Sequence, residues 1–124
     1  MDKPADRYDI QTDVLFAPGA HMDIAALAAG IQPWTNRTLS QVNDAVVRLG
    51  VLDGDFHWHK HDGDDEFFCT VEGLLLIDLE GRTVELKPGQ GLVVPRGVLH
   101  RTRAPQRTVI LMVENAGIVP TGDA

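Results

Sequence analysis

The hydrophobic pattern of the first twenty residues is irregular and predicts neither a helix nor a strand. Polar and apolar side chains are mixed there without a clear period. Pro4 and the pair Pro18-Gly19 are typical of turns. We therefore expect residues 1–20 to form an arm that lies over the rest of the domain.

One short helix is predicted, over residues 24–29. The Asp23 carboxylate can accept hydrogen bonds from the free N–H groups of its first turn, and Gly30 suits a left-handed C-terminal cap. Pro33 and the polar residues 35–37 then break the pattern.

From about residue 39 the pattern changes to short apolar or alternating segments separated by Gly, Asp and Pro, as is typical of β-strands. Roughly eight or nine such segments, with turns every eight to twelve residues, favour an all-β sandwich or barrel. The pair Glu80-Gly81 is a strong hairpin signal. The predicted strands are residues 42–52, 56–61, 66–71, 74–79, 83–86, 91–94, 98–102 and 108–114.

The composition fits one domain. A chain of 124 residues could not divide into two cores that are both large enough to be stable. Aromatic residues make up only 6% of the chain, so the core must rest on aliphatic side chains. We divide the chain into an N-terminal arm with a helix (1–36), a barrel (37–116) and a C-terminal tail (117–124).

Charge and hydropathy argue against two classes of partner. The net charge of −7, without any run of Lys or Arg, disfavours nucleic acid and anionic membranes. Apolar stretches such as residues 74–77 are far shorter than the roughly 20 residues that cross a bilayer. Because residues 1–6 lack the apolar region of a secretory signal, we expect a cytoplasmic protein. The lone Cys69 is expected to be a small buried side chain.

Three histidines in one predicted strand are the first residues that indicate a metal site. Side chains alternate along a strand, so His57, His59 and His61 are expected on the same face. Same-face neighbours lie roughly 7 Å apart, within reach of two imidazoles that bind one ion.

A carboxylate and a further histidine complete a candidate metal site. Glu66 opens the next predicted strand after a tight acidic turn, and His100 follows the turn at residues 95–97. Together with His59 and His61 they offer three imidazoles and one carboxylate. This set suits Mn, Fe, Co, Ni, Cu or Zn, is poor for Ca or Mg, and leaves positions open for water or substrate.

These residues resemble the two signatures of the cupin superfamily, and the resemblance covers about residues 37–114. Two positions depart from the usual form: Gly54 lies one place nearer to His59, and Ala104 stands where an Asn is usual. The matching stretches are His59-x-His61-x4-Glu66-x6-Gly73 and Gly89-x5-Pro95-x-Gly97-x2-His100.

The resemblance to small single-domain cupins implies a jelly-roll barrel with His59, His61, Glu66 and His100 as ligands of one divalent metal ion. The signature glycines also have a physical role, because tight turns need a positive φ, and Pro95 fixes the entry to the strand of His100. The glycines expected at such turns are Gly73, Gly81, Gly89 and Gly97.

Side chains around the ligands have several possible roles. His57 should face inward as a general base, a substrate contact, a hydrogen-bond partner behind the ligands, or simple packing. Phe56 and Trp58 are expected to point away from the metal face, and Phe67 away from Glu66. Residues 74–77 are apolar on both faces, which favours a homodimer.

Two functions follow from such a site. The first is a metal-dependent enzyme that acts on a small oxygen-rich metabolite as an isomerase, epimerase or lyase, or, with Fe, as a dioxygenase. The second is a module that binds or senses a small molecule without turnover. A purely structural barrel is a third, weaker reading.

Overall fold

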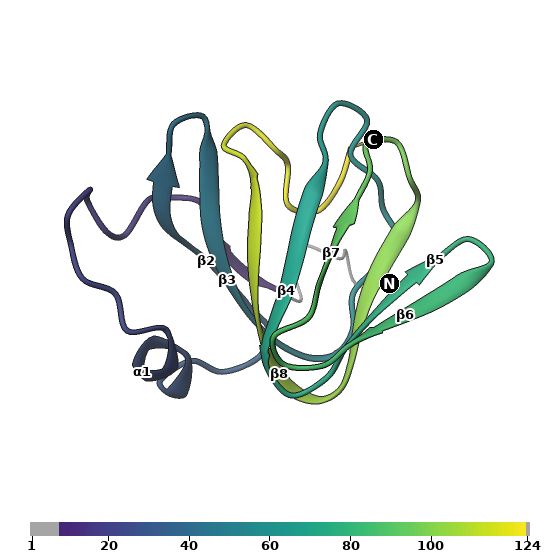
Figure 1. Cartoon of the computed structure of the whole chain (residues 1–124), viewed down its shortest axis with the longest axis horizontal. Helices are drawn as coiled ribbons and strands as arrows, with labels where there is room; N and C mark the ends of the chain where they lie inside the picture. Colours follow the sequence, from purple (N-terminus) through teal and green to yellow (C-terminus); the bar gives the residue numbers. More distant parts are fainter. Residues whose placement is uncertain (1–7, 124) are drawn as a thin grey trace.

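The computed structural model describes residues 8–123 and is built almost entirely of β-strands, as predicted (Figure 1). Within this range it has eight strands and one short helix. In chain order they are β1 (Asp9–Gln11), α1 (Ile24–Ala29), β2 (Thr35–Val42), β3 (Ala45–Asp55), β4 (Glu66–Glu72), β5 (Leu75–Leu79), β6 (Arg82–Leu86), β7 (Gly91–Val94) and β8 (His100–Asn115).

The long strand β8 organises the sheet. The order of hydrogen-bonded neighbours is β1-β2-β3-β8-β4-β7, and the hairpin β5–β6 joins through β5 to the beginning of β8. The later part of β8 lies between β3 and β4. In this described part of the chain the pairing does not close into a full ring, because β1, β6 and β7 each pair on one side only.

Three predictions of strand boundaries are wrong. Residues 35–42, of which the first three were expected to break the pattern, form β2, because pairing with β1 and β3 outweighs their polar character. The predicted strand 42–52 is interrupted by a turn at Asn43, whose φ of 54° is a left-handed value that Asn tolerates well. The predicted strands 98–102 and 108–114 are one continuous strand, β8.

The predicted helix is confirmed, but its C-terminal cap is not the expected one. The Asp23 carboxylate accepts a hydrogen bond from the Ala26 N–H at 3.1 Å, as anticipated. Gly30 has a φ of −91° and is not left-handed. The guanidinium of Arg107 instead donates to the carbonyls of Ala28 and Ile31, and so satisfies the end of the helix from another strand.

Two apolar clusters hold the sheet and the helix. One lies inside the curved sheet and includes Phe68, Leu75 and Ile77. The other lies between the sheet and α1, where Ala28 packs with Leu49. The four predicted turn glycines, Gly73, Gly81, Gly89 and Gly97, all have positive φ between 76° and 90°, which confirms that prediction.

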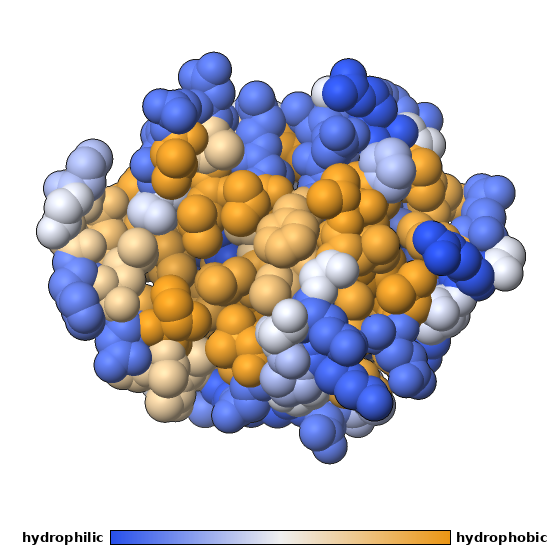
Figure 2. Space-filling view, in the orientation of Figure 1, coloured by the Kyte–Doolittle hydropathy of each residue, from blue (hydrophilic) through white to orange (hydrophobic). Residues whose placement is uncertain are grey.

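Apolar side chains also cover an outer face of the sheet. Figure 2 shows them over the middle of the face formed by β3, β8, β4 and β7. Val71, Val93 and Val113 are exposed there, whereas Leu75 and Ile77 of the stretch 74–77 are fully buried. The homodimer stays a prediction, and this outer face is now the better place for it. No helix of residues 8–123 is long and apolar enough to cross a bilayer.

Asp78 on β5 anchors an ion-pair cluster. Its carboxylate accepts hydrogen bonds from Arg103, from Arg101 at 2.7 Å and from the Thr83 hydroxyl at 2.7 Å. The bond from Arg103, helped by Thr83 and Arg101, outweighs burial and holds the pKa of Asp78 well below its usual range. The ionised carboxylate thus ties the hairpin to β8.

We expect Asp78→Asn to lower the free energy of unfolding at pH 7 by about 2 kcal/mol, because it removes charge-assisted hydrogen bonds. A depressed folded-state pKa contributes stability above the unfolded pKa of roughly 4, and this stability is lost as the pH falls. The difference between variant and parent, measured by urea unfolding, should therefore shrink from pH 5 to pH 2. A constant difference across this range would contradict the role of the ionised carboxylate.

Candidate metal centre

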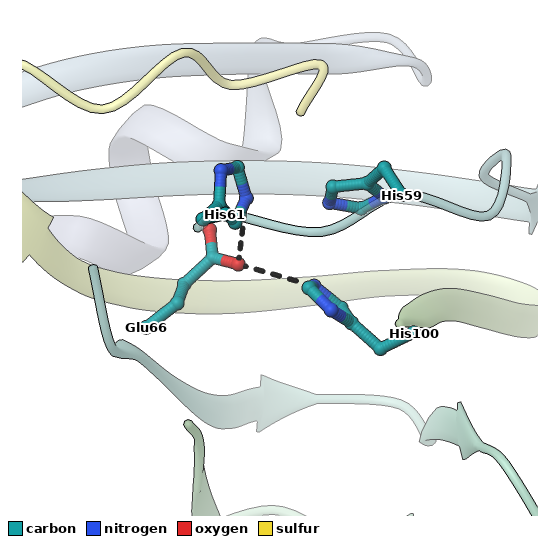
Figure 3. A group of neighbouring side chains, drawn as sticks. All are labelled: His59, His61, Glu66 and His100. Atoms are coloured by element: carbon teal, nitrogen blue, oxygen red, sulfur yellow. Dashed lines mark ion pairs between the residues drawn. The ribbon is translucent and has the colours of Figure 1, made fainter. Parts of the chain in front are cut away.

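Four side chains singled out by the sequence meet inside the fold. One ligand atom from each of His59, His61, Glu66 and His100 lies within 4.8 Å of the others. All four residues are buried, with exposed fractions between 1% and 8%. Figure 3 shows the Glu66 carboxylate between the rings of His61 and His100. The arrangement could hold one metal ion.

The segment that carries His59 and His61 is not the strand predicted over residues 56–61. Its one bridge of strand type joins His59 to His100 through two backbone hydrogen bonds of 2.8 and 2.9 Å. A further bond runs from the Gly97 N–H to the His61 carbonyl at 2.8 Å. The ring centroids of His59 and His61 lie 5.0 Å apart, closer than the roughly 7 Å between same-face neighbours of a flat strand.

Backbone carbonyls orient two of the rings. His59 Nδ1 donates to the carbonyl of His57 at 2.9 Å, and His100 Nδ1 donates to the carbonyl of Val98 at 2.9 Å. A neutral ring that donates from Nδ1 keeps Nε2 free of a proton. The Nε2 atoms of both rings are therefore prepared to act as ligands.

The electrostatics of the group favour the protonation states that a metal ion requires. Burial, and next to it the neighbouring His100, lowers the pKa of His59 to about 4, so its ring is neutral at pH 7. Burial alone would raise the pKa of Glu66, but the imidazoles of His100 and His61, 3.3 and 3.4 Å from its carboxylate, outweigh burial and hold this pKa well below normal. An anionic carboxylate beside a neutral imidazole is a suitable ligand pair.

Unpaired polar atoms at the centre of the group fit a metal ion. Within residues 8–123, both ring nitrogens of His61, Nε2 of His100 and Oε1 of Glu66 are buried without a hydrogen-bond partner. The carboxylate oxygen lies 3.4 Å from His61 Nε2 and 3.3 Å from His100 Nε2. Buried polar atoms are costly when unpaired, and a transition-metal ion would satisfy this set of nitrogen and oxygen donors.

Two charged residues behind the group were missed in the sequence. Glu114 lies opposite Glu66 on the neighbouring strand, hydrogen-bonds to it, and is only 4% exposed. Arg48, 1% exposed, lies 3.6 Å from the Glu114 carboxylate. Burial and the negative charge of Glu66 raise the pKa of Glu114 far above its usual range, so Glu114 stays protonated and can donate a hydrogen bond to Glu66. The sequence feature that could have revealed them is a charged residue within each of the otherwise apolar strands β3 and β8.

His57 lies beside the four-residue group rather than in it. Its ring centroid is 5.2 Å from that of His59. Its Nε2 lies 2.6 Å from the Thr121 carbonyl, to which it donates, and its Nδ1 lies 3.5 Å from the hydroxyl of Tyr8. His57 therefore connects the N-terminal arm and the C-terminal tail to the ligand segment. Its role in chemistry stays a prediction.

The aromatic neighbours follow the predictions only in part. Trp58 points outward, is 43% exposed, and has the Arg101 guanidinium 5.2 Å from its ring. Phe56 does not point away as expected. Its ring packs edge-on against His59 at 5.1 Å, because the segment is not a regular strand and its side chains do not alternate strictly.

A small cavity adjoins the group, and His59 and Glu66 form part of its wall. The rest of the wall is mainly apolar and includes Leu52, Phe68 and Met112. The space that water molecules can occupy inside it is about 40 Å³. A molecule held there would therefore lie directly against two of the candidate ligands.

Comparisons with known proteins agree with this architecture. A family model described as "Cupin domain" (Cupin_2) matches residues 45–114. The protein YdbB of Bacillus subtilis (strain 168) is 47% identical over 81 residues, which are 64% of this chain and 72% of YdbB.

Solved structures show the same fold. A cupin-2 domain containing protein from Shewanella frigidimarina NCIMB 400 is 31% identical, with a TM-score of 0.69, over 73% of this chain and 89% of that one. Protein NMB1881 from Neisseria meningitidis is 26% identical, with a TM-score of 0.70, over 77% of this chain and 99% of that one.

We expect His100→Ala to reduce the affinity for Zn²⁺ or Co²⁺ at least a hundredfold, because the ring supplies one of four donors. Titration calorimetry on protein stripped with a chelator measures this. His21→Ala is the matched control, since His21 is exposed and lies outside the group. Equal metal affinities of the two variants would remove His100 from the site.

The hydrogen bond from Glu114 to Glu66 gives a second prediction. Glu114→Gln keeps a neutral donor and should leave the metal affinity within about threefold of the parent. Glu114→Leu removes the donor and should weaken binding about ten- to a hundredfold, as is typical for residues that orient metal ligands. If the Leu variant binds Zn²⁺ as tightly as the Gln variant, Glu114 does not orient Glu66.

Proposed function

The chain belongs to the cupin family, and on that premise we propose that it is a metal-dependent enzyme acting on a small metabolite bound at His59, His61, Glu66 and His100. The main support is that four buried residues bring one ligand atom each to the same place, and that two of them, His59 and Glu66, line a cavity. A purely structural barrel would have no need of unpaired polar atoms at this depth. The ion would be Mn, Fe, Co, Ni, Cu or Zn.

The metal ion and the cavity wall would have different roles in catalysis. When bound, the ion would polarise a carbonyl or hydroxyl oxygen of the substrate and stabilise negative charge that develops on it. Leu52 and Phe68 in the cavity wall exclude water, which strengthens electrostatic interactions inside. This chemistry suits isomerisation, epimerisation or elimination, or, with Fe, dioxygenase chemistry.

Such reactions also need a group that moves a proton. We propose His57, whose Nδ1 lies 3.5 Å from the Tyr8 hydroxyl. Tyr8 lines the cavity, so a proton would pass between His57 and a bound molecule through this hydroxyl. The Thr121 carbonyl, 2.6 Å from Nε2, keeps the proton of the neutral ring on Nε2 and leaves Nδ1 as the acceptor.

A second function, binding or sensing without turnover, is favoured by one observation. Both ring nitrogens of His57 already have partners in the structure, and the cavity wall offers few other groups that could act as a base. The same centre would then hold a ligand without converting it.

Turnover separates the two functions. We expect protein loaded with one of the six metals to exchange hydrogen for deuterium in, or to convert, a small 2-oxo acid, hydroxy acid or diketone, as followed by proton NMR in D₂O. His57→Ala should lower kcat about a hundredfold and leave the metal affinity unchanged. His21→Ala should behave as the parent.

Three outcomes of this experiment have different meanings. Binding of these compounds without conversion under any metal would favour the binding module. Full activity of His57→Ala would exclude His57 from the mechanism. Failure to take up any of the metals would contradict both functions.

We further propose a homodimer that covers the apolar outer face around Val93 and Val113. A small molecule is the expected ligand, and the net charge of −7 argues against nucleic acid and anionic membranes as partners. The cytoplasm stays the expected location.

A further inference from the structure

The walls of the cavity beside the metal ligands differ from those expected for an oxygen-rich metabolite. Hydrocarbon side chains from β3, β4 and β8 form most of its surface, among them Leu52, Phe68, Ile110 and Met112. All four belong to the apolar cluster inside the curved sheet, and all are at most 6% exposed. Hydroxyl groups of a sugar would lose their bonds to water against such walls without finding new partners.

Aromatic rings stand at another side of the cavity. The ring centroids of Tyr8 and Phe56 are 4.4 Å apart, and Trp34 lies 5.3 Å from Tyr8 and 5.5 Å from Phe56. All three residues line the cavity together with Ile10 of β1. Flat or branched apolar groups pack well against such rings.

Besides the candidate ligand Glu66, Asn36 also brings an unpaired polar atom to the wall. Asn36 on β2 lines the cavity, and its Oδ1 is buried without a hydrogen-bond partner in the described part of the chain. Buried amide oxygens are almost always paired, so this atom is free to accept a hydrogen bond from a molecule in the cavity.

We propose that the cavity binds a small, mainly hydrocarbon molecule, aromatic or branched aliphatic, with metal-binding oxygens at one end and a hydrogen-bond donor for Asn36 elsewhere. This inference rests on the proposed function and narrows its substrate class. The oxygens face the end of the cavity formed by His59 and Glu66, and the apolar body packs among the remaining wall residues. The 40 Å³ that water can occupy is less than a whole aromatic ring needs, so the occupant is small and the wall side chains move apart when it binds.

Two hydroxamates test the apolar body, because they share one metal-binding group and differ in the attached group. We expect Co²⁺-loaded protein to bind benzohydroxamate at least tenfold more tightly than acetohydroxamate, measured from the visible absorption of the bound Co²⁺. This ratio of affinities is divided by the ratio that the same two hydroxamates show for Co²⁺ in free solution. A corrected ratio near one, or a preference for acetohydroxamate, would overturn the proposal.

A wall variant shows whether the preference arises in this cavity. Ile10→Asn should reduce the ratio at least threefold and leave the binding of Co²⁺ and of acetohydroxamate unchanged. Val14→Asn is the matched control, since Val14 is 44% exposed and lies outside the cavity wall. An unchanged ratio in Ile10→Asn that still binds Co²⁺ would place the preference elsewhere.

Amino-substituted benzohydroxamates test Asn36. At least one of the 2-, 3- and 4-amino isomers should bind threefold more tightly than the parent compound, and Asn36→Leu should abolish this gain without weakening benzohydroxamate. The absence of any gain, or a gain that survives in Asn36→Leu, would exclude Asn36 as the acceptor.

The failures of the two proposals are distinguishable. If the protein takes up no Co²⁺, the proposed function fails. If it takes up Co²⁺ and binds both hydroxamates equally, only the apolar substrate class fails.

Discussion

The candidate site depends on one short backbone contact, the pair of hydrogen bonds between His59 and His100. These bonds of 2.8 and 2.9 Å fasten an irregular segment to the first residue of β8. Without them the segment of His59 and His61 would be fastened only by single backbone hydrogen bonds at Phe56, Lys60 and His61, which offset less of its ordering entropy. Glu66 enters from the start of β4, which pairs with the other end of the same strand. A single long strand thus places ligands from three separate segments.

The site places unusual demands on the interior of a small domain. Arg48, Glu114 and Glu66 form a buried polar chain that ends at the imidazoles, with several atoms left unpaired. A buried charge is tolerated only when other groups or an ion compensate it. Binding of a metal ion to the folded state would supply this compensation and would also stabilise the fold by mass action. The same few residues would therefore determine both metal binding and the stability of the fold.

The sequence predicted the residues of the site better than their geometry. His59, His61, Glu66 and His100 could be chosen because their spacing carries a recognisable pattern. The strand expected over residues 56–61 is absent, because its backbone pairs through one bridge only. Long-range contacts account for most of the other differences. Arg107 caps a helix nearly eighty residues earlier, and Phe56 turns toward the cavity through packing against Tyr8.

X-ray absorption spectroscopy of the Co²⁺- or Zn²⁺-loaded protein tests the central claim most directly. The account predicts a first shell of nitrogen and oxygen at about 2.0–2.2 Å, with outer-shell scattering from three imidazoles. A shell without imidazole scattering, or one that contains the sulfur of Cys69, would contradict it.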